Sequence, residues 1–250
     1  MKKWIENDII KPDGSDIENI PYRETNNYLR KVLKNYRIYK KLYDLQGVNH
    51  WSHLWWSLVG RKTKMDLEEV KKDLKQILSE KRYTHSVGTM NMAKELASVY
   101  GEDEDEAAFA GLIHDIAKEM TKDEIEQYVK IHKIKMDKIE KENVGLLHAK
   151  IGASIAKERY GASKEVQNAI LYHTTGNVKM DRFAKIIYVA DKIEENRTYP
   201  GVEELRELAK KDLDKTILIL IDFVIEKSNR LGRVTHPDTL KLREKLINFT

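Results

Sequence analysis

The chain has 250 residues, of which 41% are hydrophobic and 34% charged, with 4 Pro, 12 Gly and no Cys. This composition allows a core of ordinary size, favours long helices over many short strands, and excludes disulfides and thiolate zinc sites. The net charge of +4 is uneven, because residues 1–64 hold 13 Lys/Arg and 7 Asp/Glu whereas residues 65–250 hold 32 and 34. A nucleic-acid-binding protein should carry its positive charge on its folded body. We therefore expect no nucleic-acid partner.

No secretory signal peptide and no membrane span are expected. Lys2 and Lys3 are not followed by the apolar run of about 7–15 residues that a signal peptide requires. The longest apolar stretch, residues 217–225, is interrupted by Asp222 and is too short to span a bilayer. Together with the absence of cysteine, these features predict a cytoplasmic protein.

Residues 1–64 are predicted to form a separate N-terminal extension, partly helical and non-catalytic. Residues 17–44 resemble the C-terminal tail of soluble lytic transglycosylases. That resemblance lacks the upstream domain which would hold a catalytic glutamate, so it implies no such activity. The segment 50–56, His-Trp-Ser-His-Leu-Trp-Trp, has two histidines at metal-binding spacing but is interpreted as an aromatic linker or dimer contact. A homodimer is therefore a further expectation.

Residues 65–250 are predicted to form an all-α domain, because their apolar residues recur at helical spacing almost without a break. The first helix begins near Asp66 and the second ends at Gly101, a typical helix-terminating residue. Residues 105–118 are predicted to form the next helix, with a His-Asp pair in its apolar middle. Polar residues in an apolar segment are a local inconsistency of the kind that often marks a functional site.

Several further helices are expected after residue 120. Thr121 begins a short helix with a capping-box pattern, and Gly161 ends the helix that carries His148. The loop 196–201 then precedes two or three final helices. The helices would form a bundle whose inward side chains can meet at one centre.

Six residues of this domain are candidate metal ligands. Each is a His or Asp in an apolar context, where an unpaired polar group costs a few kcal/mol. For any single one, a hydrogen-bonded core residue is the commoner explanation, and only the whole set together indicates a metal site. The six residues are His85, His114, Asp115, His148, His173 and Asp191. In contrast, His132 and His236 are expected at the surface.

The domain resembles HD-domain phosphohydrolases, whose H…HD…D signature is reproduced by four of these residues. The two further histidines, with the segments 114–118 and 190–197, make residues 66–248 similar to the HD-domain family of symmetrical bis(5′-nucleosyl)-tetraphosphatases. The resemblance implies an HD-domain helical bundle and iron as the metal. It also implies cleavage of a dinucleoside tetraphosphate, such as diadenosine tetraphosphate, into two nucleoside diphosphates. The N-terminal 64 residues depart from the family pattern.

The ligand types indicate the metals and the chemistry. Four imidazoles and two carboxylates, without sulfur, suit Fe, Mn or Zn better than Mg or Ca. Six ligands are too many for one catalytic ion with open positions, so two divalent ions are expected, with Asp115 as the bridging ligand. Two metals about 4 Å apart can hold a hydroxide and clamp phosphate oxygens. Asp115 is therefore a catalytic candidate, together with Lys118, expected one helical turn after His114.

Five residues are predicted to bind substrate: Lys118, Thr174, Thr175, Arg197 and Tyr199. Lys118 and Arg197 carry charges suited to phosphate, and the ring of Tyr199 can stack on a base. The two threonines can donate hydroxyl and backbone hydrogen bonds. The alternative for Lys118 is a solvated lysine at a helix end.

Other functions remain open. The domain can be an HD phosphohydrolase of another nucleotide, or a non-catalytic nucleotide-sensing HD module, because a fold does not determine function. A binding module has no need of six metal ligands, which argues against the second alternative. A cell-wall role, suggested by residues 17–44, is opposed by the lack of a signal peptide and of a catalytic domain.

Overall fold

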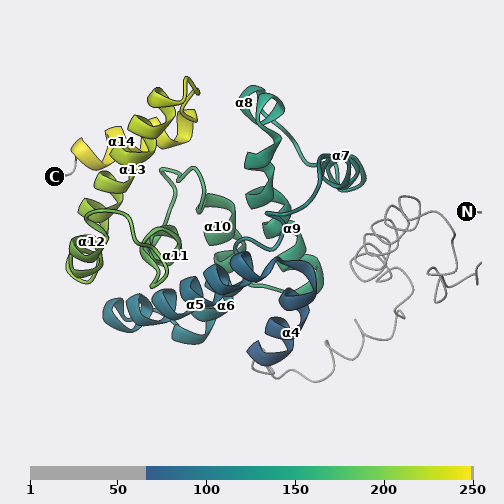
Figure 1. Cartoon of the computed structure of the whole chain (residues 1–250), viewed down its shortest axis with the longest axis horizontal. Helices are drawn as coiled ribbons and strands as arrows, with labels where there is room; N and C mark the ends of the chain where they lie inside the picture. The colour runs from purple at the N-terminus through teal and green to yellow at the C-terminus, as the bar shows by residue number, and fades with distance from the viewer. Residues whose placement is uncertain (1–65, 249–250) are drawn as a thin grey trace, which may run out of the picture. The chain divides into compact units, whose positions relative to one another are not determined.

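The computed structural model describes residues 66–248, and their regular secondary structure is entirely helical (Figure 1). The predictions for residues 1–64, including the tail resemblance and the tryptophan-rich segment, lie outside the described residues. The helices are α4 (Leu67–Ile77), α5 (Glu80–Tyr100), α6 (Glu104–Ile113), α7 (Lys122–Ile131), α8 (Lys138–Glu142), the 3-10 helix η3 (Val144–Leu147), α9 (His148–Tyr160), α10 (Lys164–Tyr172), α11 (Arg182–Ile193), α12 (Val202–Ala209), α13 (Leu213–Arg230) and α14 (Pro237–Asn248). The predicted all-α fold is confirmed for this part of the chain.

Local sequence sets most helix boundaries. The side chain of Ser79 caps α5, and Thr121 with Glu124 forms the predicted capping box at the start of α7. Helices α5 and α9 end at Gly101 and Gly161, which adopt left-handed backbone angles with φ of 70° and 62°. These ends agree with the sequence analysis because caps depend on residues close in sequence.

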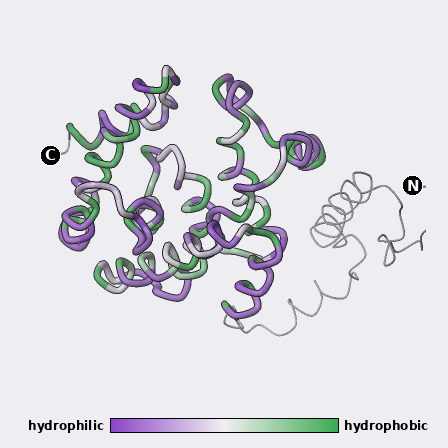
Figure 2. Tube along the Cα trace, in the orientation of Figure 1, coloured by the Kyte–Doolittle hydropathy of each residue, from purple (hydrophilic) through white to green (hydrophobic). Residues whose placement is uncertain are grey.

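The core lies among α5, α6, α10 and α11. Every residue from Ala107 to Ile113 of α6 is buried, and α6 packs against α5, α10 and α11. A Cβ atom on Gly111 would lie 2.8 Å from the carbonyl oxygen of Thr89, so glycine is what allows α5 and α6 to approach closely. Figure 2 shows that α4, α7 and α12, at the periphery, are largely hydrophilic.

The prediction of one helix over residues 105–118 is wrong, because α6 ends at Ile113. Beyond it the backbone forms successive turns, in which the N–H of Ile116 donates to Ile113 and that of Lys118 donates to Asp115. The His-Asp pair therefore lies just after a helix rather than in its middle. Ile116 is still buried although it lies outside a helix. Its apolar side chain therefore continued the helical pattern in the sequence beyond the true end of α6.

The apolar run 217–225 lies in α13, one of three final helices, as expected. Ile217, Leu220 and Ile221 are buried, and α13 packs against α11, α12 and α14. Phe223 lies on another side of α13 and is 44% exposed. Within residues 66–248, no helix has the length and apolar character needed to cross a bilayer.

Candidate metal centre

The six predicted ligands converge from five helices or helix ends. His85 lies in α5, Asp191 in α11, and His148 is the first residue of α9, whereas the others follow α6 or α10 directly. In three overlapping groups the ligand atoms lie within 4.8 Å of one another. The groups are His85, His114 and Asp115; His114, His173 and Asp191; and Asp115, His148 and His173.

Asp115 lies between two pairs of imidazoles. Its Oδ2 is 3.8 Å from Nε2 of His85 and 3.6 Å from Nε2 of His114. Its Oδ1 is 3.3 Å from Nε2 of His148 and 3.4 Å from Nε2 of His173. The two oxygens of one buried carboxylate thus face two different histidine pairs, as a bridging ligand would.

Asp191 lies beside the first histidine pair, His85 and His114. Its Oδ1 lies 3.1 Å from Nε2 of His85 and 3.6 Å from Nε2 of His114. Arg197 donates from Nη2 to the same oxygen at 3.1 Å, and Lys192 donates to Oδ2 at 3.3 Å. The two cations fix the carboxylate in place and partly neutralise it.

Three of the imidazoles are oriented by the same kind of local hydrogen bond. In each, Nδ1 donates to the backbone carbonyl three residues earlier, at 2.6–2.7 Å. These carbonyls lie in the last turn of a helix or in a 3-10 helix, where acceptors commonly lack a regular helical partner. Because Nδ1 carries the hydrogen, Nε2 of the neutral ring presents its lone pair to the centre. The pairs are His114 with Gly111, His148 with Gly145, and His173 with Ile170.

A carboxylate performs the same function for the fourth imidazole. Nδ1 of His85 donates to Oε1 of Glu194 at 3.1 Å. Glu194 is only 1% exposed, and its Oε2 accepts hydrogen bonds from the backbone and side chain of Asn196. A Cβ atom on Gly88 would lie 2.3 Å from that oxygen, so glycine leaves the space that Glu194 occupies. Carboxylate–histidine pairs of this kind fix the tautomer of metal-binding imidazoles.

The donor atoms fit a cation. Within residues 66–248, Nε2 of His85, Nε2 of His114 and Oδ1 of Asp115 are buried without a hydrogen-bond partner, and each such atom costs about 1–3 kcal/mol. Nε2 of His148 and Nε2 of His173 lie 3.1 Å apart, where two lone pairs repel each other. Divalent cations bound here would accept lone pairs from these atoms and would remove both penalties.

The protonation states favour the same conclusion. Burial raises the pKa of Asp115, but the imidazoles of His114, His148 and His173 outweigh it and hold the pKa well below its usual range. Burial lowers the pKa of His173 to about 4. At neutral pH the cluster therefore offers a carboxylate and a neutral imidazole, the forms in which these side chains bind metals.

Comparison with known proteins identifies the family. The model of the HD domain family matches residues 82–196. The symmetrical bis(5′-nucleosyl)-tetraphosphatase of Bacillus subtilis is 39% identical over 176 residues, which cover 70% of this chain and 94% of that protein. The protein of the same name from Halalkalibacterium halodurans is 38% identical and 93% covered. The chain belongs to the HD-domain hydrolase family that includes these tetraphosphatases.

A solved structure shows the same fold. The crystal structure of a Clostridium acetobutylicum protein, described as a predicted HD superfamily hydrolase involved in NAD metabolism, superposes with a TM-score of 0.71 at 37% identity. The match covers 74% of this chain and 99% of that one. All six predicted ligands of this HD-domain hydrolase lie within the range 82–196 that the family model matches.

Two of the predicted substrate-binding residues contact the imidazoles of the cluster. Nζ of Lys118 lies 3.1 Å from Nε2 of His148. Oγ1 of Thr174 lies 2.9 Å from that nitrogen and 3.0 Å from Nε2 of His173. One hydroxyl hydrogen cannot be donated to both nitrogens at once. The hydroxyl of Thr175 instead donates to the carbonyl oxygen of Gly176 and is not placed on the cluster.

The other two predicted residues lie beyond Asp191. Arg197 contacts Asp191 as described above, and the hydroxyl of Tyr199 donates to the carbonyl oxygen of Lys192 at 2.9 Å. His132 and His236 are half-buried rather than fully exposed. They contact Glu158 and Asp137 respectively, and they belong to no group with the six predicted ligands.

Two charged residues of this site were not predicted from the sequence. Arg82 donates from Nη1 to Oδ2 of Asp115 at 2.6 Å, and Glu194 orients His85. Arg82 stands one helical turn before His85, a spacing that could have suggested it. Nothing in the sequence distinguishes buried Glu194 from exposed Glu195, because only tertiary packing separates them.

We expect Glu194→Gln to weaken metal binding by roughly 10- to 100-fold, since the amide removes the charge that holds the Nδ1 hydrogen of His85. Glu195→Gln, an exposed neighbour, is the matched control and should bind metal as the wild type does. Metal content after dialysis against a graded series of chelator concentrations measures both. Equal retention in the two variants would contradict this role for Glu194.

Proposed function

We propose that this chain is a metal-dependent hydrolase that cleaves dinucleoside tetraphosphates, such as diadenosine tetraphosphate, symmetrically into two nucleoside diphosphates. The names of the two relatives support this substrate. The observation that carries the proposal is the position of Asp115 between two histidine pairs, which creates two adjoining ligand sets in one buried cluster. The absence of cysteine suits work in the reducing cytoplasm.

Two divalent ions are proposed for these sets. The ligand types suit Fe, Mn or Zn, and the resemblance to the HD-domain tetraphosphatases favours Fe among them. His85, His114 and Asp191 would hold one ion, His148 and His173 would hold the other, and Asp115 would join both. Bound divalent metals lower the pKa of water and stabilise the charge that develops on a phosphoryl group. The buried position of the cluster keeps other water away from the reacting phosphate.

Lys118 and Thr174 are proposed to bind the phosphate chain. The Lys118 side chain is 34% exposed while its ammonium lies beside the cluster, 3.9 Å from Oδ1 of Asp115. It can therefore reach a phosphate that enters from solvent. The Thr174 hydroxyl can donate a hydrogen bond to a phosphoryl oxygen. Arg197 would hold the next phosphate, since its guanidinium is anchored on Asp191.

A substrate panel tests the proposal. Protein purified without chelators is analysed for metals and incubated with diadenosine tetraphosphate, with mononucleotides and with signalling nucleotides. We expect turnover of the tetraphosphate with ADP as the sole product, at a ratio of two per substrate. AMP with ATP would show asymmetric cleavage. Hydrolysis restricted to another nucleotide would support a different member of the HD-domain phosphohydrolases.

The N-terminal extension, residues 1–64, is proposed to be dispensable for this activity, and residues 65–250 are proposed to be the catalytic domain. The side chain of Asp66 caps α4 by accepting a hydrogen bond from Glu68, so a chain beginning at Met65 keeps its first helix cap. We expect the shortened protein to stay folded and to keep most of its activity, as circular dichroism and turnover would measure. Insoluble or unfolded protein would contradict this.

The proposed homodimer can be examined with the same two proteins. Residues 50–56 are interpreted as an aromatic linker or a dimer contact, and as a dimer contact they should make the full chain elute as a dimer in light-scattering chromatography. The protein beginning at Met65 should elute as a monomer. A monomeric full chain would remove the basis for the proposed dimer.

A further inference from the structure

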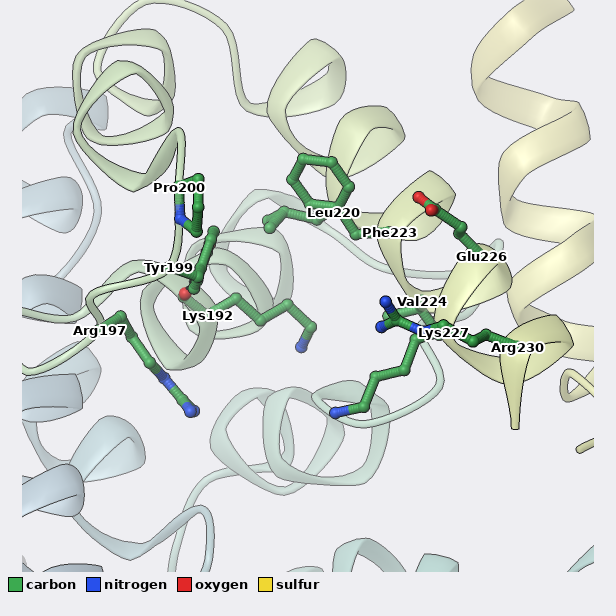
Figure 3. Close-up of a pocket in the computed structure, with 10 residues that line it drawn as sticks. All are labelled: Lys192, Arg197, Tyr199, Pro200, Leu220, Phe223, Val224, Glu226, Lys227 and Arg230. Carbon is green, nitrogen blue, oxygen red and sulfur yellow. Dashed lines mark hydrogen bonds between the residues drawn. The ribbon is translucent and has the colours of Figure 1, made fainter.

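A cleft of about 450 Å³ lies between α13 and the segment that follows α11, next to the metal centre (Figure 3). Small-molecule sites have volumes of about 300–1,000 Å³, so the size of the cleft suits a small ligand such as one nucleoside diphosphate. Its lining includes Arg197, Tyr199, Leu220, Phe223 and Lys227.

The cleft has an apolar end and a cationic end. Figure 3 shows Pro200, Leu220 and Phe223 gathered at one end, whereas the charged tips of Arg197 and Lys227 lie at the other. Among residues 66–248, the ammonium of Lys227 forms no ion pair, which leaves it available to an anion. Glu226, the carboxylate in the lining, points away from the cationic tips (Figure 3).

The aromatic rings at the apolar end are accessible to a ligand. The rings of Tyr199 and Phe223 lie edge to face with centroids 6.4 Å apart. The hydroxyl of Tyr199 is bonded to the backbone of Lys192, which holds its ring in place. Phe223 leaves 44% of its surface exposed, so a flat heterocycle packed against it would remove apolar area from water.

The cationic end is continuous with the metal centre. Nη2 of Arg197 contacts Oδ1 of Asp191 at 3.1 Å, and that oxygen lies 3.1 Å from Nε2 of His85. A phosphate chain that begins at the cluster can therefore pass Arg197 and Lys227. The attached nucleoside would then reach the two aromatic rings.

We propose that this cleft binds one nucleoside diphosphate half of the substrate. The base packs against Phe223, and the phosphates lie between Lys227 and Arg197. The phosphate at which the substrate is cleaved lies at the cluster of metal ligands. Phe223 and Lys227 thus become binding residues of the tetraphosphatase reaction, supplied by α13, which lies beyond the segment that the HD domain model matches. This inference rests on the proposed function, because it assigns one half of that substrate.

Binding of ADP and of pyrophosphate to the full-length, metal-loaded protein tests the assignment by calorimetry. Pyrophosphate lacks the nucleoside and reports the phosphate contacts alone. We expect Phe223→Ala to raise the dissociation constant of ADP about tenfold, the scale of lost base stacking, and to leave that of pyrophosphate unchanged. Lys227→Ala should weaken both ligands. Phe223→Tyr, which keeps a ring, should bind ADP as the wild type does.

Leu240→Ala and Lys241→Ala, at exposed positions of α14, are the matched controls and should bind both ligands normally. The inference is overturned if Phe223→Ala binds ADP like the wild type, or if it loses pyrophosphate to the same extent. If the wild-type protein cleaves the tetraphosphate, either result rejects the cleft as the nucleotide site and leaves the proposed function intact. If Phe223→Ala loses ADP affinity while the wild-type protein does not cleave the tetraphosphate, the proposed substrate is rejected and the nucleotide site is retained.

Discussion

Asp115→Ala should lower turnover of a dinucleoside tetraphosphate by about three orders of magnitude or more, which corresponds to about 4 kcal/mol of transition-state stabilisation. The variant removes the one carboxylate whose two oxygens face both histidine pairs. It also leaves Arg82 without the carboxylate that it contacts at 2.6 Å. We therefore expect both proposed metals to be lost along with activity.

Lys118→Ala is the comparison that separates loss of metal from loss of a substrate contact. Its ammonium is proposed to hold a phosphate, so activity should fall by roughly 10- to 100-fold, as expected for one charge-assisted contact. Metal content should stay at the wild-type level, because Lys118 is no ligand. Elemental analysis beside steady-state kinetics measures both quantities. Near-normal turnover and full metal content in Asp115→Ala would exclude the two-metal proposal.

Removing the metals should lower the melting temperature by about 10 °C. A ligand that binds only the folded protein stabilises it by about 4 kcal/mol when its concentration is a thousand times its dissociation constant. In a domain of this size, each kcal/mol shifts the midpoint by roughly 2–4 °C. The ligand atoms come from five helices or helix ends, so the complete site exists only in the folded state. Without metal, the facing lone pairs of His148 and His173 remain close together.

Thermal unfolding with and without a chelator measures this effect. Asp115→Ala is the control, because a protein that already lacks metal should melt at the same temperature in both conditions. Adding back iron, manganese or zinc should restore the wild-type midpoint, and the metal that restores it at the lowest concentration is the preferred one. Identical wild-type curves, with metal loss verified, would contradict a stabilising metal centre.

The sequence alone predicted the all-α fold and several helix ends, and it nominated the candidate ligands. Helix caps such as Thr121 and Gly161 act through residues a few positions away, so their signals can be read locally. The candidate ligands were visible because a charged or imidazole side chain in an apolar segment is costly unless it is paired. His85, His148 and Asp191 each show that contrast in the sequence.

Local signals failed where packing outweighs them. The apolar residues Ile116 and Ala117 predicted a continuing helix, yet the chain turns after Ile113 and places His114 at the helix end. There Nδ1 of the imidazole donates a hydrogen bond to the carbonyl oxygen of Gly111, so Nε2 is the nitrogen that faces the centre. Periodicity indicates that a residue is buried, but it does not indicate its backbone conformation.

Only the tertiary structure decided the orientation and surroundings of the ligands. Glu194 and His85 are 109 residues apart, and their hydrogen bond depends on the glycine at position 88. The cleft likewise depends on α13 meeting the loop that follows α11, so Phe223 carries no functional signal of its own in the sequence. A sequence specifies which side chains are costly to bury unpaired, whereas the packing of distant helices determines which partner each of them meets.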